Sequence, residues 1–556
     1  MLLAAALAVV AVRLVQVQVL EHDYYKRESD GFIIREIPLH AARGSILDRM
    51  GRELAVDRPA VAVYVHPQRL ADPLATARGL GAILGVSPDS ILKRMSECSD
   101  PFMYVDRQVD ASLKPQIQEL AKREDQAIGT EPSTRRVYPK GSVAADVLGF
   151  TGIERAGLAG IEAACDKLLR GQPGQAVGER DAMGWPIPHR TRVVQPVRDG
   201  TTLKLTIDLA VQEACERELA EAVKSNHAKA GCAVVLDART GDVLAACDYP
   251  TYDPNSWEGT QQSVWAPRFA TWTYEPGSTM KPLVAAMALD TGILTENSTF
   301  TCNKTYTLGR HKLECRHAPA GGHGTLSVAD ILKYSCNIGA LQIGLKAKGE
   351  RMARLFNGLG FTEPPTTELP SQYQVLPTYL VPAWCATSSY GQGISITPLH
   401  LAAAYGALAN GGERMRARFI MATVDPSGAV SERPPVREGR VFSAETARRV
   451  LKMLTRVVED RDGTGREARV PGLAVAGKTG TAEIPGPGGY LANQWIVSFA
   501  GVLPADDPHY VIVVVIDRPT GTAYGGTVAA PVFRDIAESI VTTLQIPIDD
   551  PSRGKQ

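Results

Sequence analysis

The middle of the chain reads Glu275-Pro276-Gly277-Ser278-Thr279-Met280-Lys281. Proline and glycine interrupt regular structure, and the apolar run 282–289 that follows predicts a helix that begins near Ser278. Ser278 and Lys281 are three residues apart, so on a helix they share one face. The positive end of the helix dipole stabilises a developing alkoxide, and a neutral amine can take the hydroxyl proton. The pattern indicates an activated nucleophile; a helix-start serine beside a surface lysine is the alternative.

Two later motifs strengthen this interpretation. Ser335-Cys336-Asn337 follows the amphipathic segment 326–334, as a loop at a helix end does, and Lys478-Thr479-Gly480-Thr481 continues the strand-like run 473–477. Each motif is weak alone, because short matches arise by chance in long chains. In the order Ser278, Ser335, Lys478 they resemble the set found in penicillin-recognising serine acyltransferases.

The residue types suit acyl transfer from a peptide that ends in a free carboxylate. Ser278 is the expected nucleophile and Lys281 its base. Burial and a second cation, Lys478, would lower the pKa of the Lys281 ammonium. Ser335 would pass the proton to the leaving nitrogen, and Asn337 would hold both Lys281 and the substrate amide.

The segment 478–481 is expected to bind substrate. Lys478, Thr479 and Thr481 would hold the terminal carboxylate through charge-assisted hydrogen bonds, with Gly480 between the two threonines. The backbone N–H groups of Ser278 and Thr481 would form an oxyanion hole.

Strand-like runs around this motif set predict one sheet. Two runs joined by the turn 239–242 predict a buried antiparallel hairpin, and three more runs lie near the C-terminus. Helical stripes at 209–222 and 532–544 flank them, so an α+β domain over residues 200–548 with a five-stranded antiparallel sheet is predicted. The intervening segment 255–465 is expected to be mostly helical, with the site in a cleft at the sheet edge. The five runs are residues 232–237, 243–246, 473–476, 496–502 and 510–516.

Residues 21–195 show no catalytic pattern. Residues 43–55 predict strand, tight turn and strand, which we interpret as a surface hairpin with salt bridges and a structural role. Glycines recur over residues 135–174, which predicts irregular structure made of hairpins and short helices. We expect a non-catalytic spacer or docking domain, with a boundary near residues 190–200. Amphipathic helices are expected in it at 75–84, 90–95 and 113–122, beside a short strand at 61–65.

The first 12 residues are almost wholly apolar. A bilayer-spanning helix needs about 20 residues, and reaching that length includes Arg13, whose long side chain can reach the interface. A membrane anchor over residues 1–20 is favoured; a cleaved signal peptide and a buried helix are the alternatives. Either of the first two places the bulk of the chain outside the cytoplasm. Residues 549–556 are interpreted as a tail.

Length and composition set outer limits. A chain of 556 residues exceeds one ordinary core, so two or three domains are expected. A hydrophobic fraction of 44% and a charged fraction of 22% are typical of a folded globular protein. The formal net charge of zero gives no electrostatic case for nucleic-acid binding.

Beyond the three motifs, the chain resembles the class B penicillin-binding proteins, which are bacterial cell-wall D,D-transpeptidases. The resemblance covers residues 13–545. Asn337 stands where elongation-type members usually carry Asp, which favours the division (septal, FtsI-like) branch. The supporting segments are Arg43 to Ala55, Arg136 to Pro139, Gly149 to Glu162, Tyr390 to Gly393, and Tyr524 to Gly526.

This resemblance implies a membrane anchor, an elongated pedestal and a penicillin-binding transpeptidase domain. It implies a D-Ala-D-Ala stem peptide as donor, an amine of a neighbouring stem as acceptor, and acylation of Ser278 by β-lactams. It further implies a single-pass protein of the inner (plasma) membrane with a periplasmic catalytic domain. An FtsW-like glycan polymerase and other division proteins would be its partners. No metal and no organic cofactor is expected.

Nine cysteines are scattered along the chain and do not form a dense disulfide framework. The spacing of Cys302, Cys315, His317 and His323 resembles that of zinc ligands. A disulfide between Cys302 and Cys315 and unpaired thiols are the favoured alternatives, and the pairing stays open. Cys336 is interpreted as a small packing residue, with a redox switch as the alternative.

Other functions remain open at this stage. A D,D-carboxypeptidase, an elongation-type transpeptidase, and a non-catalytic β-lactam sensor or scaffold share the same motifs. A β-lactamase needs a water-activating residue, and no glutamate motif of that kind is recognised. A histidine base is disfavoured because neither His317 nor His323 has a carboxylate at triad-like spacing.

Overall fold

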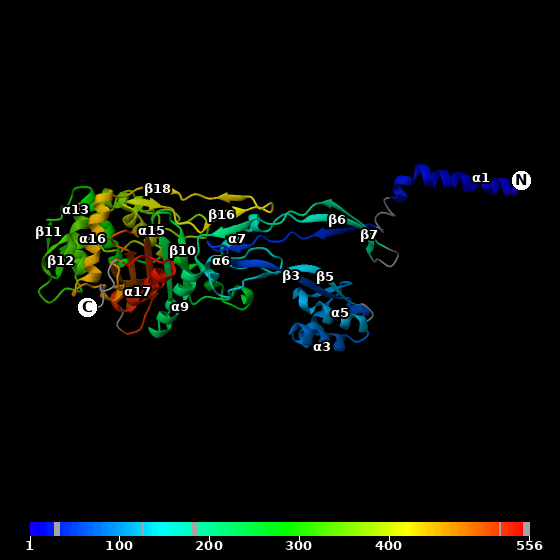
Figure 1. Cartoon of the computed structure of the whole chain (residues 1–556), viewed down its shortest axis with the longest axis horizontal. Helices are drawn as coiled ribbons and strands as arrows, with labels where there is room; N and C mark the ends of the chain where they lie inside the picture. Colours follow the sequence, from blue (N-terminus) through cyan, green and yellow to red (C-terminus); the bar gives the residue numbers. More distant parts are fainter. Residues whose placement is uncertain (27–33, 125–126, 181–185, 522–523, 549–556) are drawn as a thin grey trace.

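The computed structural model describes residues 1–26, 34–124, 127–180, 186–521 and 524–548. The chain is elongated, with the N-terminal helix at one end and a sheet-and-helix body at the other (Figure 1). Helix α1 spans Leu2–Val15 and continues as a π-helical turn, η1, over Gln16–Leu20. Within the described ranges, no helix combines the length and the sustained hydropathy that a membrane crossing requires. The expected tail, residues 549–556, lies outside the described residues.

A five-stranded antiparallel sheet forms the centre of the C-terminal body, as predicted. Its strand order is β10-β9-β21-β20-β19. The motif Lys478 to Thr481 lies within the edge strand, as expected from the sequence. This strand begins three residues later than the predicted run, because residues 470–473 form a short bridged turn. The strands are β9 (Ala230–Asp237), β10 (Val243–Tyr249), β19 (Ala476–Gly486), β20 (Gly489–Leu503) and β21 (Tyr510–Asp517).

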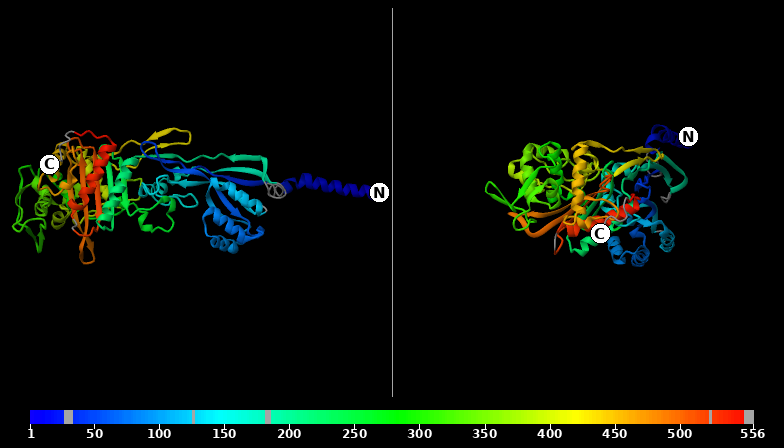
Figure 2. Two further views of the ribbon diagram at one scale, coloured as in Figure 1. Left: turned by 60° about the horizontal axis from the view of Figure 1, so that its bottom comes forward. Right: turned by 60° about the vertical axis from the view of Figure 1, so that its left-hand side comes forward.

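The sheet is buried on both faces. In β21, Val511, Val513 and Val515 point into one apolar core, whereas the alternate residues Ile512 and Val514 point into another. The second core is closed by α9 (Leu209–Ser225) and α17 (Gly525–Thr543), the two predicted flanking helices. The first core lies under α11 (Lys281–Asp290), α15 (Pro398–Ala409) and α16 (Ala444–Glu459). Figure 2 shows these helices on opposite sides of the sheet.

The segment between the two halves of the sheet is only partly helical. Residues 328–459 contain α12 (Val328–Lys333), α13 (Asn337–Gly358), α14 (Pro382–Ser388), α15 and α16, as expected. Residues 299–327 instead form two small sheets, β11 (Thr299–Cys302) with β14 (Gly324–Ser327), and β12 (Thr305–Leu308) with β13 (His311–Glu314). The four strands have four residues each and expose many side chains, so the sequence has no long apolar run that would predict them.

A seven-stranded sheet joins the N-terminal part to the body. Its order is β17-β16-β8-β2-β3-β4, with β5 also paired to β3. Strand β8 pairs with β2 on one side and with β16 on the other, so the sheet crosses the predicted boundary near residue 200. The strands are β2 (Ile46–Leu47), β3 (Glu53–Val65), β4 (Met103–Asp110), β5 (Ile128–Val137), β8 (Thr202–Leu205), β16 (Ile420–Val424) and β17 (Val430–Glu432).

The remaining N-terminal elements follow the predicted helices closely. Helices α3 (Pro73–Leu84), α4 (Pro88–Glu97) and α5 (Lys114–Arg123) pack on the β3–β5 region around their own apolar core. A separate three-stranded ribbon, β1 (Ile34–Leu39), β6 (Gly174–Arg180) and β7 (Pro186–Gln195), extends toward the N-terminal end in Figure 1.

The segment 43–55 does form strand, turn and strand, but the prediction of a surface hairpin was wrong. The Arg43 guanidinium lies 2.6 Å from the Glu162 carboxylate, and Arg136 lies 2.7 Å from the other oxygen of the same carboxylate. All three side chains are at most 3% exposed. Asp57 accepts further bonds from Arg136 and Arg155. Residues far apart in sequence therefore share one buried ion-pair network, which sequence spacing does not reveal.

Candidate active site

Ser278 lies in a single 3-10 turn, η6 (Gly277–Met280), and α11 begins at Lys281. Pro282 occupies the first turn of α11, where a missing N–H costs nothing. Gly277 adopts φ +59°, a left-handed conformation that favours glycine. The predicted helix start is thus confirmed, with a tighter first turn than expected.

The Ser278 turn packs closely against Gly391, at a position where a side chain would not fit. Gly391 has φ +84°, and a Cβ atom there would lie 2.1 Å from the Gly277 carbonyl oxygen. The neighbouring Gly393 N–H donates to the Glu275 carboxylate at 2.8 Å. The segment Tyr390 to Gly393, singled out in the sequence, therefore positions the Ser278 turn.

Lys281 connects the first two motifs. Its Nζ atom lies 2.9 Å from Ser278 Oγ and 2.6 Å from Asn337 Oδ1. It also donates to the Ser335 carbonyl at 2.5 Å and lies 3.1 Å from Ser335 Oγ. The side chain is 1% exposed. The amine therefore bridges the hydroxyls of Ser278 and Ser335 in a site largely removed from water.

Ser335 has an unusual backbone conformation. Its φ is +57°, a left-handed value that costs about 1–2 kcal/mol for a non-glycine residue. It lies between α12 and α13, and Cys336 caps the N-terminus of α13. This bend turns both the carbonyl and the hydroxyl of Ser335 toward Lys281.

The third motif borders the same site on β19. Lys478 is fully buried and donates to the carbonyl and hydroxyl oxygens of Thr479, each at 3.2 Å. A Cβ atom at Gly480 would lie 2.2 Å from Ser498 Oγ and 3.2 Å from the Pro276 carbonyl oxygen, so only glycine fits between β20 and the Ser278 turn. Thr481 Oγ1 accepts from the Gly525 N–H at 3.2 Å.

Burial shifts the pKa values of the two lysines. It lowers the pKa of Lys281 to about 8, so a sizeable neutral fraction exists near neutral pH. Burial, with a smaller effect from the charge of Lys281, holds the pKa of Lys478 well below its usual range. The expectation that burial lowers the pKa of Lys281 is thus supported, whereas the charge effect between the two lysines falls on the pKa of Lys478.

Ser278 lies where two hollows meet. The larger, of about 660 Å³, is lined by Ser278, Asn337 and Thr481 together with Tyr490 and Trp495. The second, of about 300 Å³, is lined by Ser278, Ser335, Thr464, Thr479 and Thr481, among others. All three motifs therefore face one connected depression.

Several lining residues were missed by sequence reasoning. Thr464 accepts a hydrogen bond from Thr479, and Tyr490 donates to Glu275 at 3.0 Å. Arg316 and Trp495 lie together, with the guanidinium 5.6 Å from the indole centroid. These contacts depend on loop packing and strand pairing, so no local motif could have identified them.

Two family models match the chain. The transpeptidase domain of penicillin-binding proteins matches residues 231–538, and the dimerisation domain of penicillin-binding proteins matches residues 38–205. The chain belongs to the class B penicillin-binding proteins. Its three motifs lie within the first match, and the buried Arg43–Glu162 network lies within the second.

Curated relatives resemble this chain over almost its full length. Stage V sporulation protein D of Bacillus subtilis is 33% identical over 92% of the chain and 80% of its own length. Peptidoglycan D,D-transpeptidase FtsI of Escherichia coli is 32% identical over 99% of the chain and 92% of its own length. The solved structure of penicillin-binding protein 3 from Mycobacterium tuberculosis, complexed with aztreonam, is 28% identical. Its TM-score is 0.72, with 93% of this chain and 99% of that chain covered.

His317 lies beside the active site of this penicillin-binding protein. Among the described residues, no hydrogen bond joins its ring to Lys281 or Ser278. It lines both hollows, and burial lowers its pKa to about 4. The hydroxyl of Ser278 instead lies 2.9 Å from the amine of Lys281. The arrangement supports the lysine base that the sequence favoured.

Proposed function

We propose that this penicillin-binding protein is a peptidoglycan D,D-transpeptidase that forms an acyl-enzyme on Ser278. The observation that carries the proposal is the position of Lys281 Nζ, within 3.1 Å of oxygens from Ser278, Ser335 and Asn337. A nucleophile, a base and a second hydroxyl for proton transfer are thus in contact before substrate binds.

In the acylation step, Ser278 Oγ attacks the carbonyl of the penultimate D-Ala. The hydroxyl proton passes to Lys281 Nζ and then, through Ser335 Oγ, to the leaving nitrogen of the terminal D-Ala. The C–N bond breaks as the C–O ester forms. In the second step an acceptor amine attacks the ester, its proton returns through the same groups, and Ser278 is regenerated.

The β19 edge would bind the donor peptide. Lys478 with the Thr479 and Thr481 hydroxyls is proposed to hold the terminal carboxylate, and the backbone N–H groups of Ser278 and Thr481 to hold the oxyanion. Gly480 supports this role because its missing side chain lets β19 approach the Ser278 turn. Penicillins carry a carboxylate at the equivalent place, so β-lactams are proposed to acylate Ser278 as well.

We propose the same domain boundaries that the sequence predicts: a membrane anchor over residues 1–20, a pedestal domain over residues 21–195 and a transpeptidase domain over residues 200–548. The apolar side chains of α1 and η1 support membrane association, since most of those described are exposed. The relatives named FtsI support a location at the inner membrane with the catalytic domain in the periplasm.

We further propose a septal role with an FtsW-like glycan polymerase and other division proteins as partners. Asn337 in the second motif and the FtsI relatives support the division branch. Stage V sporulation protein D has a similar identity to this chain, so a role in sporulation is the alternative.

A transfer assay tests the proposal against a D,D-carboxypeptidase, which uses water in place of the amine. The purified chain is incubated with a peptide or thioester donor that ends in D-Ala and with a labelled D-amino acid as acceptor. The proposal predicts incorporation of the label, lost in Ser278→Ala. Hydrolysis without any labelled product, at saturating acceptor, would contradict it.

A further inference from the structure

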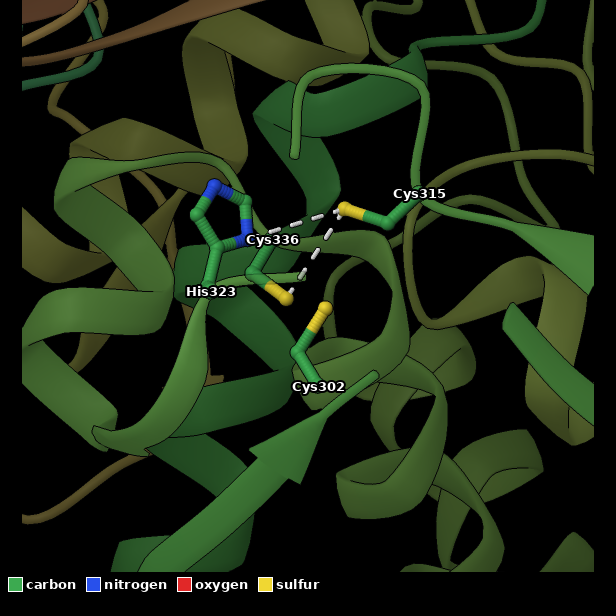
Figure 3. Close-up of side chains that lie close together, drawn as sticks. All are labelled: Cys302, Cys315, His323 and Cys336. Atoms are coloured by element: carbon green, nitrogen blue, oxygen red, sulfur yellow. Dashed lines mark hydrogen bonds between the residues drawn. The ribbon is translucent and has the colours of Figure 1, made fainter. Parts of the chain in front are cut away.

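Three cysteines and one histidine converge behind the second motif (Figure 3). Cys302 ends β11, Cys315 follows β13, His323 precedes β14, and Cys336 caps α13. One potential ligand atom from each lies within 4.8 Å of every other. Four separate segments of the chain thus place potential metal ligands close together.

The spacing of these atoms suits a tetrahedral metal better than a disulfide. Cys315 Sγ lies 3.9 Å from Cys336 Sγ and 3.9 Å from His323 Nδ1. Sulfurs bound to zinc at about 2.3 Å in a tetrahedron are about 3.8 Å apart. A disulfide requires about 2.05 Å, and all nine cysteines are free thiols here.

The surroundings of the cluster are also those of a metal site. The three cysteines are fully buried, whereas His323 is partly exposed and offers a route for an ion to enter. Cys315 Sγ accepts from the Asn337 N–H at 3.4 Å, and Cys336 Sγ accepts from the Gly339 N–H at 3.3 Å. Such N–H donors stabilise thiolates and orient metal ligands. The His323 ring stacks on Tyr334, which fixes its direction.

We propose that Cys302, Cys315, His323 and Cys336 bind one structural Zn²⁺ ion. Three thiolates and one imidazole form the Cys₃His ligand set of closed structural zinc sites, with no position left for water. This proposal revises two sequence expectations. First, no metal was expected. Second, the zinc-like spacing in the sequence included His317, but the fold places His317 along the catalytic hollow, and Cys336 is the fourth ligand instead.

The local fold gives a reason for a metal here. Two-stranded sheets are marginally stable on their own, and the β12–β13 pair has no fully buried side chain. Few apolar side chains of residues 299–327 are buried, chiefly Phe300, Ala318 and Leu326. An ion that links β11, the β13 end, the β14 start and α13 would hold these strands in place.

The site would act directly on the catalytic segment, an effect that rests on the proposed function. Cys336 stands between Ser335 and Asn337, and Asn337 donates its backbone N–H to Cys315. Both neighbours contact Lys281. The four ligands are therefore positioning residues: metal loss would release the backbone that aims Ser335 and Asn337 at Lys281.

The first test measures metal in the full-length chain, purified in detergent under reducing conditions without a metal-affinity column. We expect about one equivalent of zinc, and cobalt exchange should give the visible absorption of a tetrahedral cobalt–thiolate site. Metal-free protein that takes up neither zinc nor cobalt would overturn the proposal. So would a disulfide among Cys302, Cys315 and Cys336 in the freshly isolated chain, read by alkylation and peptide mass.

Matched variants locate the site. His323→Ala and Cys315→Ser should lose the zinc, whereas His317→Ala and Cys385→Ser should retain it, because Cys385 is buried elsewhere against the Leu380 carbonyl. Equal zinc in His323→Ala and His317→Ala would overturn the assignment. If Cys315→Ser does not fold, chelation of the wild type replaces it, with a fall in melting temperature expected and an unchanged one contradicting the proposal.

The consequence for catalysis is read separately. Zinc-free wild type should be acylated by a fluorescent penicillin about tenfold more slowly, with recovery on adding zinc. Recovery by zinc separates this effect from a failure of the acyl-transfer proposal, in which neither form would be labelled. A zinc-containing chain whose acylation rate is unchanged by zinc removal would overturn the positioning role.

Discussion

Lys281 Nζ lies 2.9 Å from Ser278 Oγ, although a helix boundary separates the two residues. Ser278 belongs to a 3-10 turn, and Lys281 begins the α-helix that follows. The tighter turn brings the amine under the hydroxyl, and burial of the amine lowers its pKa. The proposed general base and the proposed nucleophile are therefore in direct hydrogen-bond contact.

Replacing the amine should remove the base. Lys281→Met is expected to slow acylation by a penicillin by about 10²–10⁴-fold, because proton transfer from Ser278 loses its acceptor. Stopped-flow or gel-based labelling measures this rate. The matched control is Lys452→Met on the exposed face of α16, which should leave the rate unchanged. An equal loss in both variants would contradict a specific role for Lys281.

Acylation should depend on pH through Lys281. The base acts when neutral, and its pKa is lowered to about 8, so the neutral fraction grows as pH rises toward that value. The second-order rate constant should rise about tenfold per pH unit below pH 7 and level off above about pH 8. A rate that is constant between pH 6 and pH 9, or that falls over this range, would be inconsistent with a lysine base.

The buried network of the N-terminal part should carry much stability. Glu162→Gln leaves the Arg43 and Arg136 guanidinium groups without their shared buried carboxylate, which is expected to cost about 3–5 kcal/mol. Denaturant unfolding of the full chain, followed by a probe in this region, measures the change. The control Glu154→Gln breaks an exposed pair with Arg107 and should cost less than about 1 kcal/mol. Similar costs for the two variants would argue against a buried network.

A methyl group at Gly391 should disturb the Ser278 turn. Gly391→Ala combines a left-handed φ with a Cβ atom 2.1 Å from the Gly277 carbonyl oxygen, so we expect a lower melting temperature and at least tenfold slower acylation. Gly259→Ala is the control, since its φ of +86° is nearly the same but its Cβ atom meets nothing within 4 Å. The difference between them isolates the contact. Unaltered acylation in Gly391→Ala would show that the contact does not position Ser278.

The sequence predicts much of the catalytic body because its signals are local. Short apolar runs identify all five strands of the central sheet, and the motif order indicates that Ser278, Ser335 and Lys478 share one site. Two findings lie beyond local pattern. The Arg43–Glu162 pair joins residues 119 apart in the chain, and the metal-binding candidate uses Cys336 rather than His317.

Residues whose role depends on loop packing are missed for the same reason. Tyr490 reaches Glu275 across 215 residues, and Thr464 approaches Thr479 from the segment before β19. The short strands β11 to β14 also escape prediction, because four-residue strands with exposed side chains give no periodic signal.

The most direct measurement is covalent labelling by a fluorescent penicillin, run on a denaturing gel beside Ser278→Ala and followed by mass spectrometry of the labelled peptide. We expect a stable label on the wild type alone, attached within the peptide that contains Ser278. A folded wild type without label, or a label that persists in Ser278→Ala, would contradict it.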